Sequence, residues 1–195
     1  MMIIAAIFVN NIVLSQFLGI CPFLGVSKKI DTAAGMGMAV AFVMLIATIV
    51  TYPIYYYVLV PNGLEFMQTI VYILVIAALV QMVEIILKKS VPSLYAALGV
   101  FLPLITTNCT ILGVAINVVT KQFTFGSESH MLNLGEATVY ALATSLGYGL
   151  AMILFAGLRE HLSLNAVPKS FKGLPIALIT VSIMALAFLG FAGMV

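Results

Sequence analysis

Six long apolar stretches occupy most of this chain, and they constrain its fold more than any other feature of the sequence. They cover roughly residues 2–26, 36–60, 67–87, 91–118, 134–158 and 174–194, with short polar breaks between them. A helix needs about 20 mostly apolar residues to cross the hydrocarbon core of a bilayer. Transmembrane strands would instead alternate in polarity over segments of about ten residues. The sequence therefore predicts an all-α membrane protein with six transmembrane helices.

The composition agrees with this prediction. Hydrophobic residues make up 64% of the chain and charged residues 7%, and the mean hydropathy is +1.24. A soluble domain carries about 25% charged residues. Because six helices and short loops use nearly all of residues 1–195, we expect a single integral membrane domain. Its surroundings would be membrane lipid and not nucleic acid, and any nucleotide or soluble substrate would have to be handled by another protein.

Lysine and arginine are distributed unevenly among the loops. Only Lys121 follows an even-numbered stretch, and the other seven basic residues follow the first, third or fifth stretch: Lys28, Lys29, Lys88, Lys89, Arg159, Lys169 and Lys172. Cytoplasmic loops of membrane proteins are enriched in lysine and arginine. We therefore predict that these three loops face the cytoplasm and that both chain termini lie outside.

Both cysteines of the chain open the same six-residue frame, Cys-x-x-Leu-Gly-Val. The first copy begins at Cys21 in the first stretch, and the second begins at Cys109 in the fourth. Because three spans separate the copies, they cross the membrane in opposite directions. This arrangement is typical of an inverted-topology repeat. The sequence predicts a 3+3 repeat whose halves cover about residues 1–88 and 89–195.

Polar residues, prolines and glycines surround both cysteines. They are Asn10, Asn11, Ser15, Gln16, Gly19, Pro22 and Gly25 near the first, and Pro103, Thr106, Thr107, Asn108, Thr110, Gly113 and Asn117 near the second. We expect stretches one and four to be broken near mid-membrane, with polar side chains bonding the freed backbone groups. Straight helices would leave the two thiols near opposite membrane faces, whereas broken helices can bring both to the centre.

Three interpretations of the thiols remain open at this point. Each cysteine can be a small buried apolar residue, which is a common fate of free cysteine. A structural disulfide is disfavoured, because a bond inside the bilayer does not face an oxidising compartment. As metal ligands, the thiolates suit a two-iron cluster, but such a cluster usually takes four thiolates and would need two from a second chain. A small secondary transporter with incidental cysteines is the alternative function, because broken inverted repeats are common in transporters.

Longer motifs around the cysteines resemble a known family. They are VNNIVL at 9–14, FLGICPFLGVSKK at 17–29 and LGVFLPLITTNC at 98–109, together with AGLRE at 156–160 and ALIT at 177–180. Over the whole chain they resemble the A-subunit family of the Rnf complex, an ion-translocating ferredoxin:NAD oxidoreductase of prokaryotic membranes. The E subunit of the sodium-pumping NADH:quinone reductase, the Nqr complex, is similar but matches less closely.

The resemblance implies that Cys21 and Cys109 supply two ligands of an intramembrane [2Fe–2S] cluster that carries electrons across the membrane. The other two thiolates would come from the homologous E subunit of the same complex, inserted in the opposite orientation. Other subunits would carry flavins and further iron–sulfur centres. The chain would have no activity alone and would lie in the prokaryotic cytoplasmic (inner) membrane.

Four residues near the cysteines are expected to shape the breaks and to donate hydrogen bonds that tune the cluster sulfurs. They are Gly25, Thr107, Asn108 and Gly113. The stretch from Gly135 to Thr138 lacks the Ser/Thr-Gly pair of the covalent flavin motif, so no flavin is expected on this chain.

Three other features have ordinary structural interpretations. Alanine and glycine recur every four residues at 33, 37 and 41 and at 143, 147 and 151, which predicts close helix packing. Glu84 precedes Lys88 by one helical turn, which favours a simple ion pair over a place in an ion pathway. The outer loop at 121–133 is longer and more polar than the family resemblance leads us to expect.

Overall fold

The computed structural model describes residues 5–27, 29–90, 102–120, 123–125, 128–130, 133–165, 168 and 171–190. The chain divides into two compact units, which are described separately. Unit 1 comprises Met1–Ala39 and Ala143–Val195, and unit 2 comprises Val40–Leu142. Each unit thus takes residues from both predicted halves of the sequence. The division into repeat halves near residue 88 stays a prediction.

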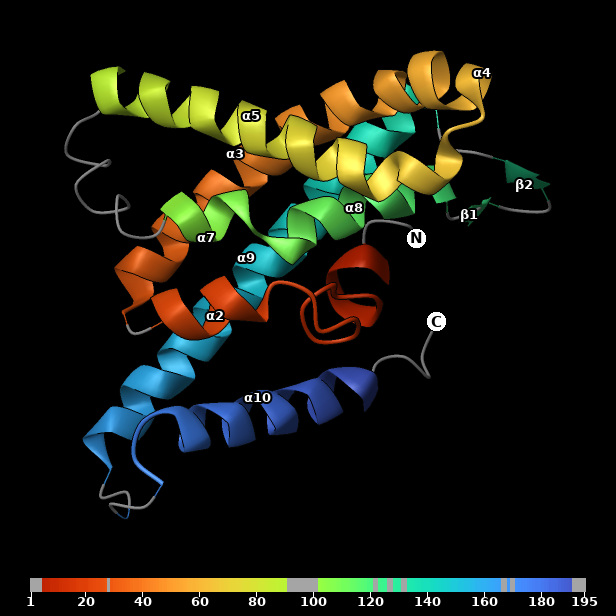
Figure 1. Ribbon diagram of the computed structural model, residues 1–195. Helices are drawn as coiled ribbons and strands as arrows, with labels where there is room; N and C mark the ends of the chain where they lie inside the picture. Colours follow the sequence, from red (N-terminus) through yellow and green to blue (C-terminus); the bar gives the residue numbers. More distant parts are fainter. Residues whose placement is uncertain are drawn as a thin grey trace. The chain divides into compact units, whose positions relative to one another are not determined.

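Unit 1 is built around the C-terminal part of helix α9 (Leu134–Leu164). It also contains the π-helical turn η1 (Ala5–Val9), the short helix α2 (Ile20–Val26), the start of α3 (Ile30–Ile54) and helix α10 (Leu174–Leu189). Figure 1 shows α2, in red, against the blue part of α9. The rings of Phe23 and Phe155 stack across this contact with centroids 4.5 Å apart, and both side chains are fully buried. This aromatic pair lies in the core of unit 1.

Unit 2 begins with the second part of α3 and continues through a π-helical turn η2 (Tyr55–Leu59) into α4 (Val60–Asn62). A 3-10 turn η3 (Glu65–Met67) leads into α5 (Gln68–Ser90), and α7 (Leu102–Thr106) and α8 (Cys109–Thr120) follow. Helix α5, in yellow in Figure 1, packs against α7 and α8, in green. Tyr72 of α5 and Ile111 of α8 are among the fully buried side chains of this unit.

Four helical stretches of the described chain are long and apolar enough to cross a membrane. They are Ile30–Asn62, Glu65–Ile86, Pro103–Thr120 and Leu134–Leu164, and α10 is a shorter apolar helix. These confirm the helical character of the second, third, fourth and fifth predicted stretches. The first stretch is not one helix, because η1 and α2 are separated by residues 10–19. Six crossings, the inverted relation of the halves and the outside termini stay predictions.

Two helix boundaries differ from the sequence prediction. Helix α3 begins at Ile30 and not near residue 36. In its first turn the Thr32 hydroxyl, which has one donor hydrogen, lies within hydrogen-bond distance of the carbonyls of Val26 (3.1 Å) and Lys29 (2.9 Å) and so links α2 to α3. Helix α9 continues to Leu164, six residues beyond the predicted end of the span. Polarity marks where a chain leaves the bilayer, whereas good helix formers such as arginine, glutamate and leucine extend the helix beyond that point.

The loop at 121–133, which is predicted to lie outside, contains a small hairpin that the all-α prediction did not include. Strands β1 (Phe123–Phe125) and β2 (Glu128–His130) pair antiparallel, with Thr124 opposite Ser129. Aromatic and β-branched residues favour strands, and Phe-Thr-Phe consists only of these types. The extra length of this loop thus provides a local strand pair.

Two helix breaks and their thiols

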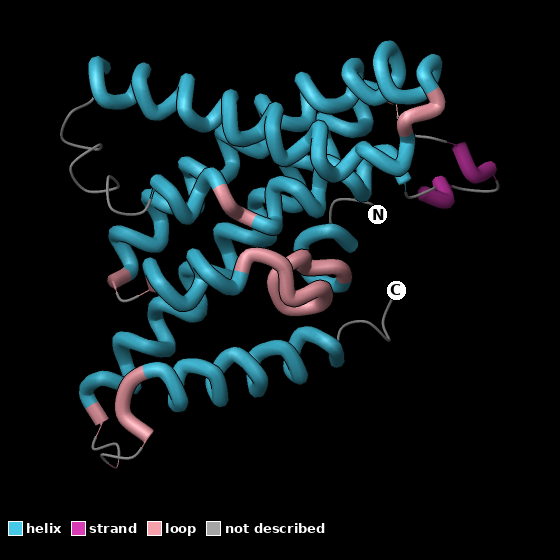
Figure 2. Tube along the Cα trace, viewed as in Figure 1, coloured by secondary structure: helices cyan, strands magenta, loops and turns pink. Residues whose placement is uncertain are grey.

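The first break covers residues 10–19, between η1 and α2. Figure 2 shows it as the long pink coil that precedes α2. Phe17 and Gly19 both have positive φ, at 55° and 81°. Glycine adopts this region freely, whereas a residue with a Cβ does so uncommonly. Residues 12–14 of the break are nevertheless buried, so the non-helical backbone here is enclosed by protein.

Asn11 provides the hydrogen bonds that the broken backbone needs, and it is only 1% exposed. Its Oδ1 accepts from the Val13 N–H (3.2 Å), and its Nδ2 donates to the carbonyls of Ile7 (3.1 Å) and Gly147 (2.9 Å). Its own carbonyl accepts from the Ser15 N–H (2.8 Å). Non-helical backbone is tolerated in membrane proteins where such partners are present. The predicted role of polar side chains at this break is confirmed.

Gly147 lets η1 approach α9 closely. A Cβ at this position would lie 3.1 Å from the Ile7 Cα and 3.3 Å from the Ile7 carbonyl oxygen. Its neighbours one turn away, Ala143 and Ala151, are 2% and 0% exposed. The predicted small-residue packing face at 143, 147 and 151 is therefore confirmed inside unit 1.

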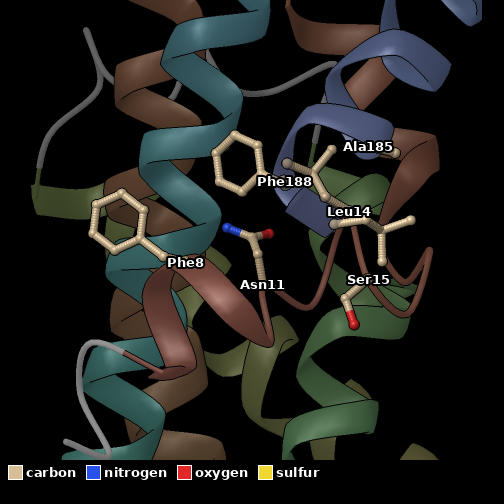
Figure 3. A pocket seen from close by; sticks show the side chains of 7 residues that line it. Phe8, Asn11, Leu14, Ser15, Ala185 and Phe188 are labelled. Atoms are coloured by element: carbon tan, nitrogen blue, oxygen red, sulfur yellow. The ribbon is translucent and has the colours of Figure 1, made fainter. Parts of the chain in front are cut away.

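A small hollow lies between the first break and α10. Figure 3 shows Asn11, Leu14 and Ser15 of the break facing Ala185 and Phe188 of α10. The hollow has no room for a water molecule. It is a packing contact between the break and α10.

Cys21 follows this break as the second residue of α2, and its thiol is free and exposed. The opposite end of α2 is held by Arg159 of α9. Arg159 Nη1 donates to the Leu24 carbonyl (2.7 Å) and the Ser27 hydroxyl (3.0 Å). A cation at a helix C-terminus bonds carbonyls that lack a partner within the helix. The sequence marks Arg159 as a basic residue at a span end and as part of the AGLRE motif, but it gives no sign of this contact.

The second break is much shorter, comprising only Thr107 and Asn108 between α7 and α8. The Thr107 hydroxyl donates to the Pro103 carbonyl (2.9 Å), and Asn108 Oδ1 accepts from the Thr110 N–H (3.0 Å). Asn108 therefore caps the N-terminus of α8. The Asn108 side chain is buried, and its Nδ2 has no hydrogen-bond partner.

Cys109 is the first residue of α8, and its thiol is also free and exposed. Its Sγ lies 3.9 Å from the Thr107 carbonyl oxygen. Burial repeats between the two Cys-x-x-Leu-Gly-Val frames. In each frame the cysteine is exposed, whereas the next two residues and the final valine are buried. The repeated frame therefore describes the same local arrangement, an exposed thiol on a helix anchored by its neighbours.

Gly25 and Gly113 lie inside α2 and α8 and not at the breaks. Each follows its cysteine by four residues and so lies on the same helix face. Because glycine has no side chain, neither helix adds a side chain of its own at this position next to the thiol.

A family model described as "Rnf-Nqr subunit, membrane protein" matches residues 1–195. The chain belongs to the Rnf-Nqr family. It is 56% identical to the A subunit of the Na⁺-translocating ferredoxin:NAD⁺ oxidoreductase complex of Acetobacterium woodii, over 98% of this chain and 95% of that protein. It is 53% and 50% identical to the A subunits of the ion-translocating oxidoreductase complexes of Syntrophotalea carbinolica and Ectopseudomonas mendocina, in each case over 100% of this chain and 96% of the relative.

These matches confirm the resemblance drawn from the sequence motifs. The names of the relatives also agree with the prediction of a translocase component that works only within a larger complex. In this Rnf-Nqr protein, Cys21 belongs to unit 1 and Cys109 to unit 2. The convergence of the two thiols stays a prediction. Within the described ranges, no three side chains of His, Cys, Asp or Glu come together as a metal-binding group.

Proposed function

We propose that this chain is the A subunit of an ion-translocating ferredoxin:NAD oxidoreductase complex in the prokaryotic cytoplasmic membrane. In this proposal Cys21 and Cys109 supply two thiolates to a [2Fe–2S] cluster, and the homologous E subunit supplies the other two. The observation that carries the proposal is the pair of exposed thiols, each placed directly after a helix break in the same local frame.

The residues around the thiols fit such a cluster. Both thiols are exposed, although most residues of the chain are apolar. A cysteine with only a packing role would be buried instead. Gly25 and Gly113 place no side chain on the helix face of either sulfur.

The number of ligands supports a shared site. The chain has two cysteines, whereas a [2Fe–2S] cluster commonly takes four thiolates. A second chain must therefore complete the site. When bound, the cluster supplies a one-electron carrier, and the role of this chain is to hold half of it at a fixed position and exclude lipid and water from it.

Asn108 is the residue best placed to tune the cluster. Its Oδ1 is used by the cap of α8, and its buried Nδ2 retains an unused N–H donor one residue before Cys109. Buried donors without a partner are costly, so each one needs an explanation such as a bound water, an ion or a redox role. A hydrogen bond from this amide to a cluster sulfur would satisfy it.

The test replaces each cysteine by serine in the full complex. We expect both Cys21→Ser and Cys109→Ser to lose the iron and acid-labile sulfide of one cluster, its spin-resonance signal after reduction, and electron transfer. Met38→Ser is the control, because it also removes an exposed sulfur-containing side chain, on α3, and should change none of these. Unchanged iron and unchanged ion transport in both cysteine variants would refute the proposal and favour the small secondary transporter.

A further inference from the structure

A second candidate site lies in unit 1, where the end of α9 meets the start of α10. The structure has a cavity of about 260 Å³ there. Its lining includes Arg159, Leu162, Ser163, Asn165, Lys172 and Ile176. Neither of the two cysteines contributes to this cavity, and nothing in the proposed electron transfer requires it.

The polar part of the cavity is suited to an anion. Arg159 and Lys172 bring two positive charges, and Ser163 and Asn165 add neutral hydrogen-bonding groups. No carboxylate is among the described residues that line it. Arg159 Nη1 donates to the Leu24 carbonyl and the Ser27 hydroxyl, and the planar guanidinium carries further N–H donors on Nη2 and Nε. Arginine binds phosphate well because its planar group presents several N–H donors in a fixed arrangement.

An apolar surface continues from the cavity along α10. Leu174 and Leu178 lie one turn apart at the start of this helix and are 63% and 50% exposed. A free phosphate would use only the cationic part, whereas an anionic lipid would also cover these leucines with an acyl chain. Basic pockets between membrane helices on the cytoplasmic side commonly bind lipid headgroups. Arg159 and Lys172 both belong to the basic residues that predict the cytoplasmic side.

We propose that this cavity binds the phosphate of an anionic phospholipid. Arg159 and Lys172 contact the phosphate, Ser163 and Asn165 contact the rest of the headgroup, and an acyl chain lies along Leu174 and Leu178. Because Arg159 also holds the end of α2, the lipid stabilises the arginine that fixes the helix of Cys21.

The experiment uses the purified complex and three probes: short-chain phosphatidylglycerol, short-chain phosphatidylcholine and inorganic phosphate. Binding is followed as the shift in thermal unfolding with probe concentration. We expect Lys172→Gln to weaken phosphatidylglycerol binding about fivefold, because a lysine near an anionic headgroup contributes about that factor. Lys29→Gln is the matched control: it removes an exposed cation from the same predicted membrane side but from outside the cavity.

A third variant tests the cavity without changing charge. Ser163→Phe fills it from an exposed position of α9 and should weaken phosphatidylglycerol binding as Lys172→Gln does. Iron content should stay unchanged in all three variants, which separates this test from that of the cluster. Equal effects of Lys172→Gln and Lys29→Gln would overturn the proposal. So would equal binding of phosphatidylcholine, or binding of inorganic phosphate as tight as that of the lipid.

Discussion

The break before Cys21 covers residues 10–19, whereas the break before Cys109 covers only Thr107 and Asn108. Besides its local bonds, the long break is held by a contact far away in the sequence, from Asn11 to Gly147, and the helix that follows it is held by another, from Arg159 to Leu24. The short break is held by its own neighbours, since its side-chain bonds join residues two to four positions apart. Two copies of one sequence frame are thus positioned in different ways.

The difference follows from the number of backbone groups that each break frees. A two-residue break can be closed by a threonine hydroxyl and a capping asparagine, which are local interactions. A longer buried break frees more N–H and C=O groups than its own side chains can bond. It therefore needs partners from another helix. Unit 1 supplies them from α9, and the site of Cys21 should be sensitive to residues more than a hundred positions away.

The largest effect is expected for Asn11→Ala. This change removes three side-chain hydrogen bonds at the first break and leaves buried backbone groups without partners. At about 1 kcal/mol for each bond, unfolding should become easier by about 3 kcal/mol. The measurement is denaturation of the solubilised protein in sodium dodecyl sulfate. Asn10→Ala, at an exposed neighbour, should have almost no effect. Similar losses for both variants would show that Asn11 does not hold the break.

The second-largest effect on stability is expected at Gly147, where η1 closely approaches α9. In Gly147→Ala the new Cβ would meet backbone atoms of Ile7, which cannot move aside as a flexible side chain does. Overpacking of this kind costs about 2 kcal/mol. Gly149→Ala is the control in the same helix, because a Cβ there meets nothing within 4 Å. Gly147→Ala should lower the unfolding temperature, and Gly149→Ala should not. A Gly147→Ala protein as stable as wild type would contradict the contact.

A smaller effect is expected at the other end of α2. Arg159→Gln removes the charge that bonds Leu24 and Ser27 and should cost about 1.5 kcal/mol, because Arg159 and Leu24 are partly exposed whereas Ser27 is buried. Hydrogen exchange gives the sharpest measurement. Amides of α2 should exchange faster in the variant, and amides of α8 should not change. The control is Glu160→Gln at the exposed neighbouring position. Faster exchange in both helices would mean that the two breaks are not held independently.

The sequence predicted the helices and both breaks but not how the breaks are held. Long apolar runs determine helical spans because lipid leaves backbone groups no other partners. Clusters of asparagine, threonine, proline and glycine locate the breaks for the same reason. The bond from Asn11 to Gly147 joins positions 136 residues apart, and no local pattern encodes such a distance. The AGLRE motif includes Arg159 among the residues that resemble the family. The contact of this arginine with α2, however, depends on tertiary packing.

The smallest change in stability, and the most specific test of the short break, is expected for Asn108. Asn108→Ser keeps an oxygen that can cap α8 but removes the buried Nδ2, so unfolding should change by less than about 0.5 kcal/mol. If Nδ2 donates to a cluster sulfur, its loss should lower the midpoint potential, because hydrogen bonds to sulfur stabilise the more negative reduced state. A redox titration followed by spin resonance measures this shift. Thr107→Ser retains the hydroxyl bond to Pro103 and serves as the control, with an unchanged potential. An Asn108→Ser complex with wild-type potential would mean that this asparagine only caps α8, and the short break would then be purely structural.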